Sequence, residues 1–279
     1  MTLAEHYPAR LVCRLLGFPR CALYRAAAPP AADAPALRGA LVRLAGEWPT
    51  YGYRRLTAML RREGHAVNGK RVRRLMAALG IQGKAPARRA RTTNSDHPFP
   101  RWPNLVEGLA VVRPDQVWVA DITYVPTAQG WLFLAAVMDL YSRQILGWSL
   151  WQNLEAGGPL QALARALANR RPRRGVIHHS DQGIQYACRD YRQLLQRHGL
   201  IASMSRKGNC YDNAAMEAFW STLKREALEE SSKWSENRVS QIIFEYIEAI
   251  YNRSRLHSSL GYQSPVDYET KTKYEENHL

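Results

Sequence analysis

Apolar positions recur along the chain in two ways, with a helical period up to about residue 81 and a strand-like period after about residue 109. Segment 9–27 contains two short apolar-periodic stretches separated by Gly17 and Pro19, which predicts two helices joined by a tight turn. Longer helical patterns cover residues 35–48, 51–64 and 68–81. The last of these is predicted to begin at Asn68, because asparagine favours helix N-caps.

The helix at 68–81 has one apolar face and one basic face. Helical spacing predicts as its core residues Val72, Leu75, Met76 and Leu79. The other face carries the cations Lys70, Arg71, Arg73 and Arg74. Such a cluster is either an ordinary solvated helix face or a DNA contact, and the helix-turn-helix context favours DNA.

From residue 109 onward the pattern predicts strands and helices in alternation. Residues 117–125 are rich in β-formers and lie between Pro114 and Pro126, and residues 130–150 contain two further strands. The elements that follow are helix 158–169, strand 175–179, helix 188–198, strand 200–205 and helix 213–228. Segment 235–252 is an amphipathic helix that is expected to pack on this region.

The net charge of +15 is concentrated in the first part of the chain. Residues 1–105 carry 19 Lys and Arg against 5 Asp and Glu, a net +14, whereas residues 106–279 carry 20 against 19. A solvated basic surface is one explanation, but an excess this uneven suits binding to a phosphate backbone. Segment 84–108 is basic, Pro-rich and without a period, which predicts an extended linker whose charges follow DNA.

The cysteines and the apolar runs bear on location. Zinc-finger spacing and a disulfide framework are both missing from the set Cys13, Cys21, Cys188 and Cys210, so reduced thiols in cytoplasm are predicted. The longest apolar run, 131–138, is too short to cross a bilayer. No membrane partner is therefore expected.

Three acidic residues stand in distinctive short segments. Asp121 lies in WVADITYV, Asp181 in HHSDQGIQY and Glu217 in DNAAMEAFWSTLK, and 35 residues separate the last two. A charge inside an apolar strand, as at Asp121, is unfavourable unless it is paired or binds a metal. Together with YGYRRL at 51–56 and NRSRLHSSLGYQSP at 252–265, these segments resemble the transposases of the IS3 insertion-sequence family. The likeness is to their second-reading-frame catalytic product, a member of the D,D(35)E integrase superfamily.

The resemblance implies an α/β fold, a ribonuclease-H-like catalytic core with a mixed five-stranded sheet and helices on both faces. A basic all-helical region of helix-turn-helix type precedes this core. The implied division is a helix-turn-helix-like segment at 1–33, a DNA-binding domain at 34–83, a linker at 84–108, the core at 109–230 and a C-terminal helix and tail at 231–279. The implied location is the bacterial nucleoid.

The three acids also predict a cofactor. Converging carboxylates repel one another unless a cation is present, and oxygen ligands without thiolates favour Mg²⁺ or Mn²⁺ over zinc. By resemblance, two ions per site are held by Asp121, Asp181 and Glu217. The implied activity is metal-dependent cleavage at the 3′ ends of an insertion sequence, followed by strand transfer into target DNA.

Other residues are candidates for roles around this centre. His178 and His179 are either metal ligands or orienting hydrogen-bond partners, and orientation is the role expected for His179 and for Asn213. Trp220 is expected in the core. The predicted DNA contacts are Arg54, Arg55, Lys70, Arg71, Arg73, Arg74, Arg88, Arg89, Arg91, Arg206, Lys207, Lys224, Arg253 and Arg255.

The implied partners are double-stranded DNA, both element ends and target, and at least one more copy of the chain assembled on it. The upstream-frame or fused product of the same element is a further partner, because family members usually act as a fusion that carries a leucine zipper. Two other functions stay open. The intact acids disfavour a non-catalytic DNA-binding regulator, and the basic helices disfavour a ribonuclease-H-like nuclease acting on RNA/DNA hybrids.

Overall fold

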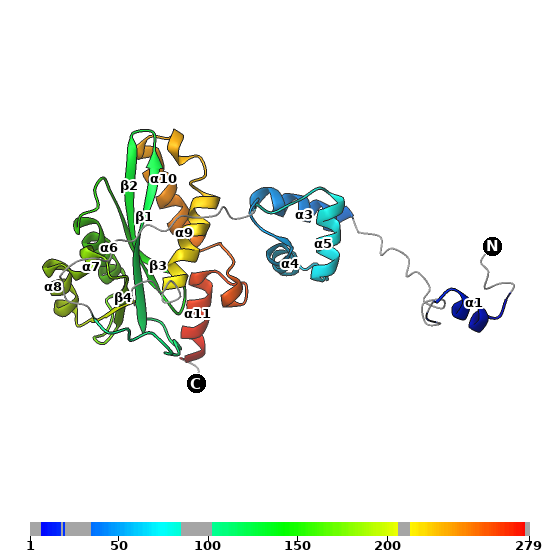
Figure 1. Ribbon diagram of the computed structural model, residues 1–279, viewed down its shortest axis with the longest axis horizontal. Coiled ribbons are helices and arrows are strands. Elements are labelled where there is room, and N and C mark those ends of the chain that lie inside the picture. The colour runs from blue at the N-terminus through cyan, green and yellow to red at the C-terminus, as the bar shows by residue number, and fades with distance from the viewer. Residues whose placement is uncertain (1–6, 18, 20–34, 85–101, 206–212, 277–279) are drawn as a thin grey trace. The chain divides into compact units, whose positions relative to one another are not determined.

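The computed structural model describes residues 7–17, 19, 35–84, 102–205 and 213–276. It divides into two compact units, Met1–Gly83 and Lys84–Leu279, each drawn in Figure 1. Several predicted DNA contacts lie outside the described residues, namely Arg88, Arg89, Arg91, Arg206 and Lys207.

The first unit is helical in its described part. Its elements are α1 (Ala9–Leu15), α3 (Pro35–Glu47), α4 (Tyr53–Arg62) and α5 (Gly69–Ala78). The Asn68 side chain caps α5 by accepting a hydrogen bond from the Arg71 main-chain N–H at 2.9 Å, as predicted. Leu79 was expected in the core but is 37% exposed, because α5 ends at Ala78 and Leu79 leaves the helical path.

The core of this unit comes from one face of each helix. Its buried side chains include Leu37, Leu41, Leu44, Leu56, Leu60, Val72, Leu75 and Met76. The opposite face of α5 keeps its cations at the surface, so the two-faced helix expected from the sequence is present.

The second unit is built on a five-stranded mixed sheet in the order β3-β2-β1-β4-β5. The strands are β1 (Val117–Thr127), β2 (Gly130–Asp139), β3 (Ile145–Trp151), β4 (Ile177–Ser180) and β5 (Ile201–Met204). β1 continues through Pro126, which was expected to end it. Beyond Ala120, β1 pairs with no described residue on the β4 side, and a residue without an N–H is tolerated at such an edge.

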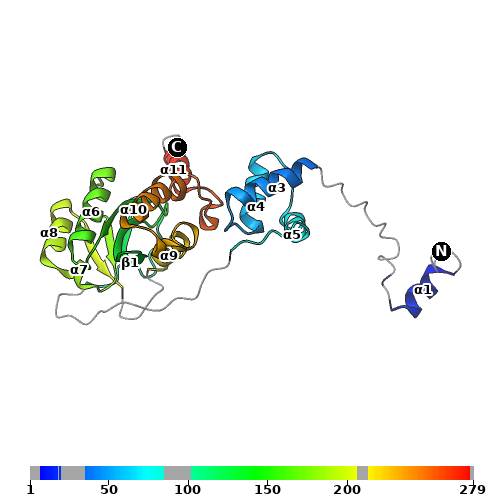
Figure 2. The same cartoon turned by 90° about the horizontal axis from the view of Figure 1, so that it is seen from above.

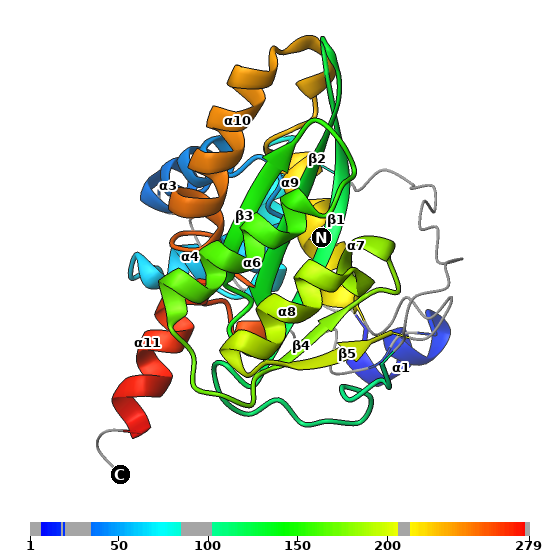
Figure 3. The same ribbon diagram turned by 90° about the vertical axis from the view of Figure 1, so that its left-hand side faces the viewer.

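Helices cover both faces of the sheet (Figures 2 and 3). One face packs on α6 (Gly157–Arg170), α7 (Ile184–Ala187) and α8 (Arg189–His198), and the other on α9 (Ala214–Glu226) and α10 (Glu236–Glu245). Successive side chains of β1 point to opposite faces of the sheet: Trp118 packs in the core with α6, α7 and α8, and Val119 packs in the core with α9 and α10. Gly147 lets α6 approach β3, because a Cβ there would lie 2.3 Å from the Ala162 carbonyl oxygen.

The C-terminal part is more regular than the expected tail. After α10 the chain continues as a π-helical segment, Tyr246–Tyr251, and the last described element is α11 (Pro265–Glu276). Between them, Asn252 exchanges two side-chain hydrogen bonds with the main chain of Ile145, at 2.9 and 3.0 Å. This pair attaches the segment to the first residue of β3.

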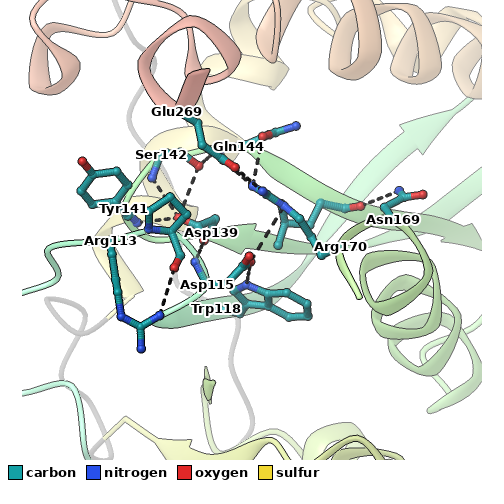
Figure 4. Close-up of polar contacts among 12 residues, drawn as sticks. Arg113, Asp115, Trp118, Asp139, Tyr141, Ser142, Gln144, Asn169, Arg170 and Glu269 are labelled. Carbon is teal, nitrogen blue, oxygen red and sulfur yellow. Dashed lines mark hydrogen bonds and ion pairs between the residues drawn. The ribbon is translucent and has the colours of Figure 1, made fainter. Parts of the chain in front are cut away.

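A buried ionic network holds α11 against the sheet (Figure 4). The Arg170 guanidinium, at the end of α6, makes a two-point ion pair with Glu269 of α11, which is 4% exposed. Arg170 also donates to Gln144 at 3.1 Å and lies 3.9 Å from Asp115. The neighbouring Asp139 is fully buried and accepts main-chain N–H bonds, including one from Asp115 at 2.7 Å.

Removal of the cation from this network is expected to destabilise the fold. Arg170→Ala leaves the Glu269 carboxylate buried without its partner, a change that typically costs about 3–5 kcal/mol. The free energy of unfolding, measured by urea denaturation, should fall by about that amount. Arg173→Ala, at an exposed position on the following loop, is the control and should change it by less than about 0.5 kcal/mol. Equal effects of the two changes would contradict this account of the network.

Candidate active site

Two of the three predicted acids meet where the pairing of β1 with β4 stops. The parallel register runs from Val117↔Ile177 to Ala120↔Ser180, and Asp121 and Asp181 are the next residues on the two chains. Neighbouring strands lie about 4.8 Å apart, so this register sets the two carboxylates side by side. Each is intermediate in exposure.

The turn after β4 fixes the orientation of Asp181. Its Oδ1 accepts a hydrogen bond from the Gly183 main-chain N–H at 2.9 Å. A Cβ on Gly183 would lie 2.9 Å from the same Oδ1, so a larger residue would displace the carboxylate. The short helix α7 then begins at Ile184.

The third acid, Glu217, comes from the first turn of α9. This helix buries Met216, Phe219, Trp220 and Leu223 against the sheet, and Glu217 itself is exposed. Trp220 is 3% exposed, which agrees with its predicted place in the core. Its indole Nε1–H also donates a hydrogen bond to Asp121 Oδ2 at 2.9 Å, a contact that the sequence analysis missed.

The charges of Asp181 and Glu217 both affect the pKa of Asp121. The pKa of the Asp121 carboxyl is raised from 3.8 to about 7, first by burial, then by the charge of Asp181 and, least, by that of Glu217. Hydrogen bonds from the Trp220 indole and the Ile122 main chain lower this pKa in part. Among the described residues, no three His, Cys, Asp or Glu side chains already form a group that would hold a metal ion. Asp181 thus affects Asp121 more than Glu217 does, and Glu217 does not complete a three-carboxylate metal site in this structure.

The histidines of HHSDQGIQY are buried and bonded to neighbours. His178 Nε2 lies 3.0 Å from the Tyr191 hydroxyl, and burial together with His179 lowers the pKa of His178 to about 3, so it is neutral at pH 7. His179 is fully buried, with Nδ1 2.9 Å from Ser203 Oγ. These contacts fix β4 to its neighbours on both faces, which suits orientation more than metal ligation.

The Tyr186 hydroxyl is a buried polar atom without a hydrogen-bond partner within the described part of the chain. The Tyr186 side chain is 3% exposed, and its pKa is raised first by burial, then by Tyr191 and by the charges of Asp121 and Asp181. Asn213 Oδ1, just before α9, is also buried without such a partner in the described residues. No periodicity marks Tyr186, but the Tyr of HHSDQGIQY was a signal that could have identified it.

The predicted DNA contacts have different surroundings. Arg54 and Arg55 of α4 lie over the rings of Tyr53 and Tyr51, at 5.6 and 5.3 Å from their centroids. On α5, Arg71 is half-buried, and the exposed cations are Lys70, Arg73 and Arg74.

One predicted DNA contact in the second unit needs correction. Arg255 is 2% exposed and makes a two-point ion pair with Glu226, at 2.9 Å to each oxygen, while the Tyr246 hydroxyl donates to the same carboxylate at 2.7 Å. It is a structural residue, because a buried guanidinium with both arms engaged cannot reach a phosphate. Arg253 is exposed and Lys224 is half-buried.

Both units match models of known protein families. The chain matches the HTH-like domain over residues 37–90 and Integrase core domain models over residues 111–210 and 198–265. The first match covers α3 to α5, and the others cover the sheet, the acids and the C-terminal segment. These matches define an integrase-type, ribonuclease-H-like catalytic core together with a helix-turn-helix-like domain.

Named relatives identify the family. The chain is 45% identical over 223 residues to the insertion element IS600 uncharacterized 31 kDa protein of Shigella sonnei, covering 80% of this chain and 82% of the relative. It is 39% identical to the transposase for IS904 of Lactococcus lactis (78% and 87% covered) and 41% identical to transposase InsF for IS3A of Escherichia coli (79% and 77%). The chain belongs to the IS3-family transposases, DDE-type polynucleotidyl transferases, as the sequence motifs indicated.

Solved structures include distant neighbours. The simian T-cell lymphotropic virus intasome aligns with a TM-score of 0.48 at 14% identity, over 82% of this chain and 74% of that one. The HTLV-2 integrase catalytic core in complex with magnesium aligns with a TM-score of 0.43 at 11% identity, over 57% and 98%. Within the described residues, no helix has the length and apolar character needed to cross a membrane.

The raised pKa of Asp121 makes a prediction for the metal-free protein. Its folded pKa of about 7 lies above its ordinary value of 3.8, so stability is lost as pH rises between these values and stays low above pH 7. Asp121→Asn removes the ionisation and should raise the melting temperature at pH 8 in EDTA, by about 2–4 °C for each kcal/mol recovered. The gain should shrink towards pH 4.

The control for this measurement is Asp190→Asn, which changes an exposed acid in the first turn of α8. It removes a carboxylate that complements the helix N-terminus, so it should not raise the melting temperature. A wild-type protein as stable as Asp121→Asn at pH 8 would show that the Asp121 carboxylate is not under electrostatic stress.

Proposed function

We propose that Asp121, Asp181 and Glu217 form the catalytic centre of this transposase and hold two divalent ions, Mg²⁺ or Mn²⁺. The observation that carries this proposal is the pair of adjacent carboxylates on β1 and after β4, with the pKa of one raised towards 7 by burial and by the other. A site of this kind is electrostatically unfavourable as an empty cluster of anions, and it becomes favourable when a cation binds.

The donor chemistry fits a hard cation. The acids offer carboxylate oxygens, His178 is neutral and engaged with Tyr191, and Asn213 Oδ1 and the Tyr186 hydroxyl are buried polar atoms without a partner in the described residues. Magnesium and manganese prefer such oxygen ligands. We propose that Glu217 joins the pair when metal binds, with His179 and Asn213 orienting the surrounding chain. Bound ions would activate the attacking oxygen and stabilise the leaving oxygen.

The reaction proposed for this centre has two displacements at phosphorus. In the first, a water oxygen attacks the phosphate at the end of the element, and the bond from phosphorus to the 3′ oxygen breaks to leave a free 3′-hydroxyl. In the second, that hydroxyl attacks a target phosphate, and the target 3′ oxygen leaves with a proton. The three carboxylates bind and orient the reacting groups, and no covalent bond to the protein is required.

Loss of any one acid is expected to abolish catalysis. Asp121→Asn, Asp181→Asn and Glu217→Gln should each reduce cleavage of end DNA in Mg²⁺ by about 10³-fold or more, since an obligatory metal ligand is removed. DNA binding, measured by gel shift, should change little. Asp190→Asn is the matched exposed control and should cleave normally.

Cleavage at more than a few per cent of the wild-type rate by any of the three variants would show that the acids are misassigned. A wild-type protein that binds end DNA but never cleaves it in Mg²⁺ or Mn²⁺ would instead support a regulator that occupies ends.

The first unit supplies the proposed DNA-binding surface. This unit, residues 1–83, holds a net +10 from 14 Lys and Arg against 4 Asp and Glu, and the exposed face of α5 presents Lys70, Arg73 and Arg74 in helix-turn-helix context. The remaining proposed contacts among the described residues are Arg54, Arg55, Arg71, Lys224 and Arg253. Double-stranded DNA, as element ends and target, is the proposed substrate.

Removal of the α5 cations should weaken DNA binding and its salt dependence together. Lys70→Ala, Arg73→Ala and Arg74→Ala combined should lower affinity for duplex DNA, and the slope of log K against log salt should fall by about 0.9 for each lost phosphate contact. The control changes three exposed arginines of the second unit to Ala, namely Arg173, Arg197 and Arg238. An equal loss of affinity in the control would contradict a dedicated surface on α5.

Two or more copies are proposed to act together on DNA, because insertion requires both element ends to be held while one catalytic centre acts at each. The upstream-frame or fused product of the same element is the other proposed partner. A bacterial cytoplasmic, nucleoid-associated location follows from this function.

A further inference from the structure

Trp220 connects the strand that carries one acid to the helix that carries another. Its indole N–H on α9 donates to Asp121 Oδ2 on β1 at 2.9 Å. Glu217 lies three residues earlier on α9, and residues at this spacing are neighbours on a helix. One hydrogen bond therefore joins the two elements that bring Asp121 and Glu217 together.

The indole ring is held rigidly by its neighbours. Trp220 is 3% exposed, and its ring centroid lies 4.7 Å from that of Phe219. Phe219 in turn packs edge-on against Tyr251 of the π-helical segment, with centroids 4.7 Å apart. The position of the N–H donor is thus set by the core, so the bond imposes a fixed orientation on the Asp121 carboxylate.

Tryptophan suits this place because the indole N–H is a donor and has no lone pair for a metal. The indole N–H engages Oδ2 of Asp121 without itself competing for the metal. The bond also counteracts burial, which favours the protonated carboxyl. A side chain without an N–H donor would neither orient the Asp121 carboxylate nor offset the effect of burial on its ionisation.

We propose that Trp220 is a positioning residue of the catalytic centre: its indole N–H aims Asp121 for metal binding and fixes α9, and with it Glu217, on β1. This inference rests on the proposed function of the three acids. It assigns to a core tryptophan a role that its burial alone does not require.

The same unit contains a matched control. Trp148 of β3 donates its indole N–H to Glu248 Oε1 at 3.0 Å, a bond of the same type between a strand and the π-helical segment. Neither Trp148 nor Glu248 belongs to the acid site. Trp148→Phe and Trp220→Phe therefore remove chemically equivalent bonds, one remote from the acids and one at them.

The experiment measures Mn²⁺ affinity of the full-length wild type and both variants by isothermal titration calorimetry, with melting temperatures in EDTA. Trp220→Phe should weaken Mn²⁺ binding by about 10–100-fold, the usual effect of losing a partner that orients a ligand. Trp148→Phe should bind Mn²⁺ within about twofold of wild type. A purely structural role for Trp220 predicts lower melting temperatures in both variants and unchanged Mn²⁺ affinity, which would overturn the proposal.

A second substitution removes only the hydrogen bond. Benzothienylalanine placed at position 220 keeps the shape of the ring and replaces N–H by sulfur. It should reproduce the weakened Mn²⁺ binding and the slower cleavage of end DNA at saturating Mn²⁺. Wild-type affinity in this protein would refute the role of the N–H, even if Trp220→Phe fails to fold. Failure of the wild type itself to bind Mn²⁺ or to cleave DNA would refute the proposed function of the acids instead.

Discussion

The end of the parallel pairing between β1 and β4 is the constraint on which the rest of the second unit depends. Four register pairs bring the strands together, and the next residue on each chain is an aspartate. Two carboxylates are thereby placed side by side in a partly buried setting, which raises the pKa of Asp121 towards 7. The surrounding fold has to overcome this unfavourable arrangement, because folding keeps two like charges adjacent that the unfolded chain would separate.

Packing on both faces of the sheet supplies the opposing stability. Gly147 lets α6 approach β3 closely on one face, and α9 buries its apolar side on the other. The π-helical segment and α11 then close the edge through Asn252 and the Arg170–Glu269 ion pair. Elements from both ends of the second unit are thus attached to one sheet, so the C-terminal segment is part of the same compact unit and not an appendage.

Sequence patterns predicted the strands, the order of elements and the two-faced α5, because alternation and helical period report burial directly. They missed α7, too short for a period, and α11, whose apolar residues are sparse. They also misassigned Arg255, since a cation's role depends on whether a carboxylate distant in sequence, here Glu226, meets it. The Trp220 bond was missed for the same reason: sequence indicates that a tryptophan is buried, but not what its N–H contacts.

The distribution of charge follows from the chemistry of an acid site. A centre of three carboxylates repels the phosphate backbone on which it must act, so affinity for DNA has to come from elsewhere or from bound cations. The second unit pairs some of its arginines with glutamates, and residues 106–279 are left with a net charge near zero. The first 105 residues carry a net +14 and include the exposed face of α5. Binding and catalysis thus make opposite demands on charge, and the chain meets them by concentrating its excess of cations in residues 1–105, ahead of the sheet that carries the acids.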